Sequence, residues 1–224
     1  MIKVDVIIPA AGVGKRMQSV VPKQYLDIDG MTILDRTIDK FISLEFINKV
    51  IVALSPNDDY FRDSKFINNP KLLVVLGGKE RCDSVYNGIL AATSEYVLVH
   101  DAARPCVLTS DIQLLVDKCS NDNGGLLVSR IPDTIKKANE HNEVISTIPR
   151  DNVYRALTPQ YFKKDLLRKA YEKSVNDGFV MTDESSAMEY LGYKPQAVVG
   201  SSTNIKITEP NDLELAKIFL QLEK

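Results

Sequence analysis

The sequence predicts an α/β fold with a mostly parallel, doubly wound β-sheet. Short continuous runs of Val, Ile and Leu, typical of strands buried on both faces, alternate along the chain with amphipathic stretches typical of helices. The 224 residues suffice for a substantial core in one large domain, and no repeat or linker divides them. Apolar residues make up 44% and charged residues 26% of the chain, which excludes disordered, collagen-like and coiled-coil proteins.

Six apolar runs are predicted to form the strands of this sheet. Each run is short, consists mainly of Val, Ile and Leu, and is separated from the next by a polar or helical stretch. In chain order the runs are residues 4–8, 50–54, 72–76, 96–99, 126–129 and 196–199. Strands joined by helices pair in parallel through right-handed crossovers.

Helical periodicity lies between the predicted strands. Apolar residues spaced three and four apart form stripes that would cover a sheet. Ser110 is typical of an N-cap and opens the third helix, while Thr208 and Pro210 open the last one. The four stripes are Ile33, Leu34, Ile38, Phe41 and Ile42; Val85, Ile89, Leu90 and Ala92; Ile112, Leu115 and Val116; and Leu213, Leu215, Ala216 and Leu220.

One segment interrupts this alternation. Residues 134–138 and 144–148 have an extended pattern and flank a polar stretch at 139–143, which predicts a β-hairpin with a five-residue loop. A lone hairpin is only marginally stable in water, so it packs either on its own domain or on a second subunit. We therefore expect one domain over residues 1–224, with a hairpin arm at about 131–151.

Charge and cysteine content exclude several classes of function. The formal net charge is −2, so the chain lacks the excess of cations that a general nucleic-acid binder needs. The three cysteines form no C-x-x-C pair, which supports neither a disulfide framework nor a zinc ribbon. No signal-peptide core or membrane-spanning stretch is found, so we expect a soluble cytoplasmic protein with no membrane partner.

The first predicted strand runs directly into a loop suited to anions. The loop reads PAAGVGKRM at residues 9–17, and PKQY follows at 22–25. Small residues let a ligand approach the backbone, whose N–H groups can cradle a phosphate, and nearby cations add positive charge. The small residues are Ala10, Ala11, Gly12 and Gly14, and the cations are Lys15, Arg16 and Lys23. The pattern matches neither G-x-G-x-x-G nor a Walker A motif.

Three further polar clusters follow predicted strands. They read GGKERCDS at residues 77–84, HDAARP at 100–105 and NIKIT at 204–208. Ligands of open α/β sheets bind beyond the carboxyl ends of the strands, so these clusters are expected to meet the glycine loop in one crevice. Arg16, Lys23, Asp101, Arg104 and Lys206 would then face the same ligand.

Structural roles remain open for several of these residues. Asp101 could cap a turn, Arg104 could form a structural ion pair, and Lys206 could be a solvated lysine at a strand end. His141 lies in the predicted hairpin loop, and His100 is expected to be a hydrogen-bonded structural residue. No Ser or Cys has the setting of a catalytic triad, so the remaining chemistry depends on positioning and positive charge.

The motifs together resemble the 2-C-methyl-D-erythritol 4-phosphate cytidylyltransferase family. The resemblance covers nearly the whole chain and includes PAAGVGKRM, PKQY, GGKERCDSV, VHDAARP, ALTPQ, TDESSAMEYLG and NIKIT in order. It implies a Rossmann-like fold whose hairpin arm reaches a second subunit of a homodimer. It also implies transfer of CMP from CTP to methylerythritol phosphate, with release of pyrophosphate and with Mg²⁺ as the divalent cation.

The resemblance further implies roles for individual residues. The catalytic residues are Arg16, Lys23, Arg150 and Lys206. CTP is bound by Ala10, Ala11, Gly12, Gly14, Gly78, Ser84 and Asp101, and Asp101 also lies beside the metal. Methylerythritol phosphate is bound by Arg104, Thr134, Arg150, Thr158, Thr182 and Lys206. In the homodimer, Arg150 would lie near the partner subunit's Lys206.

Two alternatives compete with this interpretation. The first is ribitol-5-phosphate cytidylyltransferase, whose first loop tends to be richer in glycine than the one at Ala10 and Ala11. The second is a noncatalytic nucleotide-binding protein on the same fold. Binding alone would not require Arg16, Lys23 and Asp101 together with Arg150 and Lys206, which favours an enzyme.

Overall fold

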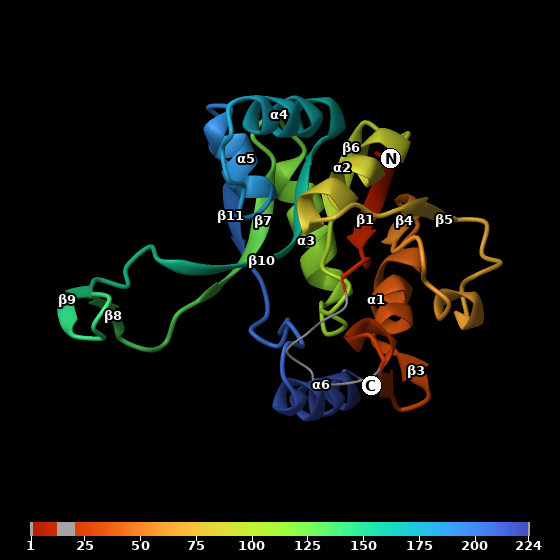
Figure 1. Ribbon diagram of the computed structural model, residues 1–224, viewed down its shortest axis with the longest axis horizontal. Coiled ribbons are helices and arrows are strands. Elements are labelled where there is room, and N and C mark those ends of the chain that lie inside the picture. Colours follow the sequence, from red (N-terminus) through yellow and green to blue (C-terminus); the bar gives the residue numbers. More distant parts are fainter. Residues whose placement is uncertain (1, 13–20, 224) are drawn as a thin grey trace.

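The computed structural model describes residues 2–12 and 21–223 (Figure 1). Its centre is a seven-stranded sheet in the order β11-β7-β10-β6-β1-β4-β5. The strands are β1 (Val4–Pro9), β4 (Ile47–Leu54), β5 (Leu72–Leu76), β6 (Tyr96–Val99), β7 (Gly125–Arg130), β10 (Tyr154–Lys163) and β11 (Gln196–Val199). β1 pairs in parallel with β4 and β6, and the β4–β5 and β7–β11 pairs are also parallel. The predicted α/β class and mostly parallel sheet are confirmed.

β10 is a sheet strand that the sequence analysis did not predict. It pairs antiparallel with β6 on one side and β7 on the other, and so joins the two parallel parts of the sheet. Pro159 and the polar residues beside it break up the aliphatic run that marked the other strands. The ladder with β7 shifts register between Ala156 and Gln160, consistent with the tolerance of proline at bulges.

Helices cover both faces of the sheet, as a doubly wound fold requires. On one face, Val6 and Ile8 of β1 pack with α1 (Ile33–Ile42) and α3 (Thr109–Cys119). On the other, Ile7 of β1 packs with α2 (Arg81–Ala91), α4 (Lys164–Asn176) and α5 (Glu184–Tyr190). Alternate residues of β1 thus enter two cores, which explains its continuous apolar run. The expectation of burial on both faces was wrong for β5 and β11, which lie at the two edges of the sheet and are largely exposed.

The helix predictions were partly right. The helix expected after Ser110 is α3, but its N-cap is Leu108 and Ser110 already lies inside it, so that N-cap assignment was wrong. The last helix is α6 (Pro210–Leu222), which begins at the predicted proline. α4 and α5 were not predicted from the sequence. α4 buries an alanine, a tyrosine and a serine beside one leucine, and α5 has only seven residues, too few for a clear period.

The predicted hairpin forms a separate two-stranded sheet. β8 (Ile135–Ala138) pairs antiparallel with β9 (Val144–Ile148), and Figure 1 shows the pair projecting away from the main sheet. A second small hairpin, β2 (Asp27–Ile28) with β3 (Met31–Thr32), precedes α1. The side chains of Val144 and Ile145 on the arm are 64% and 60% exposed.

Over the described ranges, the structure contains no helix long and apolar enough to cross a bilayer.

Candidate functional site

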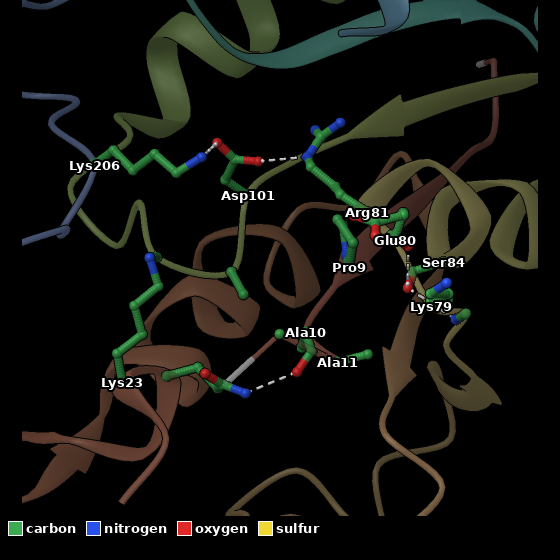
Figure 2. Close-up of a pocket in the computed structure, with 15 residues that line it drawn as sticks. Pro9, Ala10, Ala11, Lys23, Lys79, Glu80, Arg81, Ser84, Asp101 and Lys206 are labelled. Atoms are coloured by element: carbon green, nitrogen blue, oxygen red, sulfur yellow. Dashed lines mark hydrogen bonds and ion pairs between the residues drawn. The ribbon is translucent and has the colours of Figure 1, made fainter. Parts of the chain in front are cut away.

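A cavity of about 300 Å³ lies beyond the carboxyl ends of β1, β5 and β6 (Figure 2). Segments far apart in the sequence meet here because β1 is the neighbour of both β4 and β6 in the sheet. The residues that line it are Pro9, Ala10, Ala11, Gly12, Lys23, Gln24, Gly78, Lys79, Glu80, Arg81, Ser84, Asp101, Ala102, Ala103 and Lys206. Most of the predicted nucleotide-binding residues are therefore brought together.

Close backbone approach requires glycine in one wall of the cavity. A Cβ atom at Gly77 would lie 2.4 Å from the Cβ of Ala11, so the segment after β5 could not approach the first loop with any other residue. The Gly78 N–H donates to Ser84 Oγ at 3.0 Å, which ties this segment to the first turn of α2. Ser84 thus positions Gly78, and both remain at the cavity as predicted.

Gln24 is a lining residue that the sequence analysis missed. Its side chain is 4% exposed, and its Nε2 donates to the carbonyl oxygen of Ala10 at 2.8 Å. This bond holds the end of β1 against the short 3-10 helix Lys23–Tyr25, and so sets where Lys23 stands. Gln24 belongs to the PKQY motif, but its role becomes apparent only from its contact with Ala10 in the structure.

Asp101 is the electrostatic centre of the cavity. Its Oδ1 lies 3.1 Å from Arg81 Nε, and its Oδ2 lies 3.0 Å from Lys206 Nζ and 3.4 Å from Arg104 Nε. Burial alone would raise the pKa of Asp101, but the charges of Arg81, Lys206 and Arg104 outweigh it and hold the pKa well below its usual range. The carboxylate is therefore ionised, and cations outnumber it where a phosphate would bind.

Lys23 and Lys206 approach the cavity from different elements. Lys23 Nζ donates to the carbonyl oxygen of Ile207 at 3.1 Å, and Lys206 pairs with Asp101. Figure 2 shows the two side chains on the same side of the cavity. The contact with Ile207 ties the first part of the chain to the segment after β11, and both lysines line the same cavity.

A buried hydrogen-bonded group supports the loop that carries Asp101. Thr158 Oγ1 accepts the Asp101 N–H at 3.1 Å, and His100 Nδ1 lies 3.1 Å from the same hydroxyl. His100 Nε2 lies 3.0 Å from the Arg104 carbonyl, which can only accept, so Nε2 carries the proton and Nδ1 accepts from Thr158. His100 is thus the structural residue that the sequence predicted.

His100 should make folding stability depend on pH. Burial lowers its pKa from the ordinary 6.5 to about 4, so the unfolded chain takes up a proton before the folded protein does. Stability is therefore lost as pH falls, and the free energy of unfolding should drop by about 2 kcal/mol between pH 7 and pH 5 from this residue. Urea unfolding measured between pH 7 and pH 5 should show a flatter pH dependence for His100→Gln than for the unsubstituted protein.

Other predicted residues lie beneath the cavity or away from it. Arg104 and Thr158 are buried at 9% and 5% exposure, and the Nη1 of Arg104 donates to the Asn204 carbonyl at 2.7 Å. Thr182 is exposed just before α5, where its N–H donates to Ser186 Oγ. Gly14 and Arg16 fall outside the described residues.

Arg150 and Thr134 belong to the arm and not to the cavity of this chain. Both are exposed, and Arg150 donates to the carbonyl of Pro132. Arg150 lines a second cavity of about 820 Å³ at the base of the arm, together with Arg130 and Arg155. The single chain therefore does not bring these two predicted residues to Asp101.

The donor set at the cavity suits one kind of metal site. Among the described residues, no group of three or more His, Cys, Asp or Glu side chains could hold a metal ion. Asp101 supplies one carboxylate inside the cavity. Mg²⁺ is commonly held by one or two carboxylates with substrate phosphates, so the residues fit a magnesium ion bound mainly through a nucleotide.

Arg81 is the main charged residue that the sequence analysis missed. It lies within the quoted GGKERCDS segment at the first position of α2 and pairs with both Asp101 and Glu184. Its position after a strand and at the start of a helix could have indicated a residue of the ligand site. The pairing with Glu184, 103 residues further along the chain, could not be predicted from the sequence.

Comparison with known proteins agrees with the geometry. The family model for "IspD: 2-C-methyl-D-erythritol 4-phosphate cytidylyltransferase" matches residues 4–222. Curated proteins of that name from Vibrio parahaemolyticus and Shewanella oneidensis are 46% and 47% identical, each over 97% of this chain and over 95% and 88% of their own lengths. The solved Francisella tularensis structure of the same name has a TM-score of 0.83 at 38% identity, covering 97% of this chain and 99% of its own. That from Thermus thermophilus has a TM-score of 0.81 at 31% identity, over 98% and 100%.

Proposed function

The chain belongs to the IspD family of 2-C-methyl-D-erythritol 4-phosphate cytidylyltransferases, and from that premise we propose how its residues carry out the reaction. The enzyme transfers CMP from CTP to methylerythritol phosphate, giving 4-diphosphocytidyl-2-C-methyl-D-erythritol in the non-mevalonate isoprenoid pathway. The observation that supports the assignment of roles is the single cavity in which Asp101 and Lys206 lie with Lys23 and the glycine-bearing backbone.

The transfer is an in-line displacement at the α-phosphorus of CTP. An oxygen of the acceptor phosphate forms the new bond, and the bond to the bridging oxygen breaks so that pyrophosphate leaves with the electron pair. A phosphate monoester is largely ionised at neutral pH, so the nucleophile needs no general base. The buried, neutral His100 has both ring nitrogens engaged, which agrees with a mechanism driven by positioning and positive charge.

We assign the cations to the charge that develops during transfer. Lys23 and Arg16 stabilise the α-phosphate and the leaving pyrophosphate, where preorganised positive charge is most effective. Lys206 holds the acceptor phosphate beside Asp101. Mg²⁺ held by Asp101 and the nucleotide phosphates would supply further neutralisation of the triphosphate.

The remaining residues bind the two substrates. Gly78 and Ser84 form the cytosine pocket, and the backbone of Ala10, Ala11, Gly12 and Gly14 cradles the phosphates. Thr134 and Arg150 hold methylerythritol phosphate from the arm, with Thr182 nearby. Arg104 and Thr158 serve indirectly, because they are buried and hold the segments that carry Asp101 and Asn204.

The arm completes the site of a second subunit. Residues 1–224 form one domain, and the arm at about 131–151 extends from it to the partner of a homodimer. The exposed apolar side chains of Val144, Ile145 and Ile148 support burial against another surface. A two-fold axis would produce two equivalent composite sites. The three free thiols support a cytoplasmic location.

Substrate selection provides the direct test of this assignment. Pyrophosphate release should be fastest with CTP and methylerythritol phosphate, because we assign the cytosine to the small cavity bordered by Gly78 and Ser84, where hydrogen bonds to the base edge would reject another base. UTP should be poorer by about 10²-fold or more in kcat/KM, and ribitol phosphate should be the poorer acceptor. Equal turnover with UTP would refute the base-pocket assignment, and preference for ribitol phosphate would favour the alternative pentitol-phosphate enzyme.

A further inference from the structure

A line of paired polar groups leads from the helices behind the cavity to Lys206. Tyr171 on α4 donates its hydroxyl to Glu184 Oε1 at 2.9 Å, and Glu184 opens α5. Arg81 donates to both carboxylate oxygens of Glu184, at 2.7 Å and 3.2 Å. Arg81 also pairs with Asp101, which pairs with Lys206. Neither Tyr171 nor Glu184 is among the residues that line the cavity.

The guanidinium of Arg81 is held in one orientation. Its two terminal nitrogens face Glu184, so only Nε remains to face Asp101, which it approaches at 3.1 Å from Oδ1. Figure 2 shows the terminal nitrogens turned away from Asp101 while Asp101 lies between Arg81 and Lys206. A guanidinium freed from Glu184 could turn its fork onto both oxygens of Asp101, and would then compete with Lys206 for Oδ2.

Burial of the Glu184 carboxylate costs solvation free energy, which its pairing with Arg81 and Tyr171 offsets. Its side chain is 0% exposed, and a buried carboxylate is strongly unfavourable unless it is paired and hydrogen-bonded. Burial first and the charge of Glu184 second raise the pKa of Tyr171, so that its hydroxyl stays protonated and donates. The Tyr171 hydroxyl and the Arg81 fork together therefore fix the plane of the Glu184 carboxylate.

We propose that Glu184 and Tyr171 are positioning residues for CMP transfer: they hold Arg81 on Asp101 Oδ1, in the orientation that leaves Oδ2 to Lys206 and Arg104. The inference rests on the proposed roles of Asp101 and Lys206 in the cavity. Loss of Glu184 or Tyr171 should therefore disturb the placement of the acceptor phosphate. It should leave the cytosine pocket intact, because Gly78 and Ser84 are held by a separate hydrogen bond.

Glu184→Gln keeps the shape of the side chain but removes its charge. It should lower kcat by about tenfold or more and raise KM for methylerythritol phosphate, while KM for CTP stays within about twofold. Tyr171→Phe, which keeps the ring, should give a smaller defect of the same kind, about threefold. Steady-state pyrophosphate release with each substrate varied in turn measures both effects.

Double variants with Lys206→Ala distinguish a positioning role of Glu184 and Tyr171 from a general loss of structure. In a Lys206→Ala background, Glu184→Gln and Tyr171→Phe should each have less than about twofold further effect on kcat, because the group they position is gone. Fully additive effects, or normal kinetics of folded Glu184→Gln, would overturn the inference. If Glu184→Gln does not fold, the same coupling measured with Tyr171→Phe decides.

Matched tyrosines serve as controls. The ring of Tyr86 stacks on that of Tyr171, and Tyr86→Phe removes a hydroxyl that donates to Glu172. Tyr161 is 0% exposed, and Tyr161→Phe removes a hydroxyl that lies near Ser120. Both should keep normal kinetics.

If Lys206→Ala itself has normal activity, the proposed function of the cavity fails. If only the Glu184 and Tyr171 variants are normal, that function stands and this inference alone fails.

Discussion

Replacing Lys23 by alanine is expected to lower kcat by about 10²-fold or more, with a smaller change in KM for CTP. The ammonium group lies in the cavity, where its donation to the Ile207 carbonyl fixes its position before substrate arrives. A cation held in this way stabilises charge that appears mainly in the transition state, so its loss reduces kcat more than binding. Steady-state pyrophosphate release measures this difference.

Lys49→Ala is the matched control for this variant. Lys49 also donates its ammonium to a backbone carbonyl, that of Pro70 at 2.9 Å, but it lies on β4 away from the cavity residues. Its removal should leave kcat unchanged. Thermal unfolding of both variants checks that the fold is retained. A folded Lys23→Ala enzyme with near-normal kcat would contradict the mechanism. Arg16→Ala is expected to match Lys23→Ala on the strength of the sequence motif.

Mixing two inactive variants should restore about a quarter of wild-type activity if the arm completes the partner's site. The variants are Arg150→Ala and Lys23→Ala, coexpressed so that dimers form at random. Half of the dimers are then mixed, and each mixed dimer has one intact site and one site with both lesions. The physical basis is that Arg150 stands on an exposed arm in the single chain, away from the cavity that holds Lys23.

The opposite arrangement gives a different result. If the arm folds back on its own chain, every site carries one lesion, and the mixture shows only the average of the two variants. Coexpression of each variant with itself provides the baseline. The oligomeric state of each preparation, measured by sedimentation, confirms that a failure to recover activity does not come from a failure to form dimers.

Local patterns accounted for most of the fold. The strands at residues 4–8, 50–54 and 96–99 were predictable because both of their faces are buried, which produces continuous aliphatic runs. β10 was not predictable in this way. It lies in the middle of the sheet, but Pro159 and its polar neighbours give it the composition of a loop, and its place depends on β6 and β7 as partners.

The sequence by itself identified the small residues after β1 and the three polar clusters that follow strands, because each is a short motif whose chemistry is local. Only the tertiary structure decided which charges face one another. Arg81 and Asp101 are 20 residues apart, and Arg81 and Glu184 are 103 apart. They meet because the segments after β5 and β6 flank the end of β1, and because α5 packs on the same face of the sheet as α2. Side-chain pairing across such separations is set by strand order and helix packing, which no local pattern encodes.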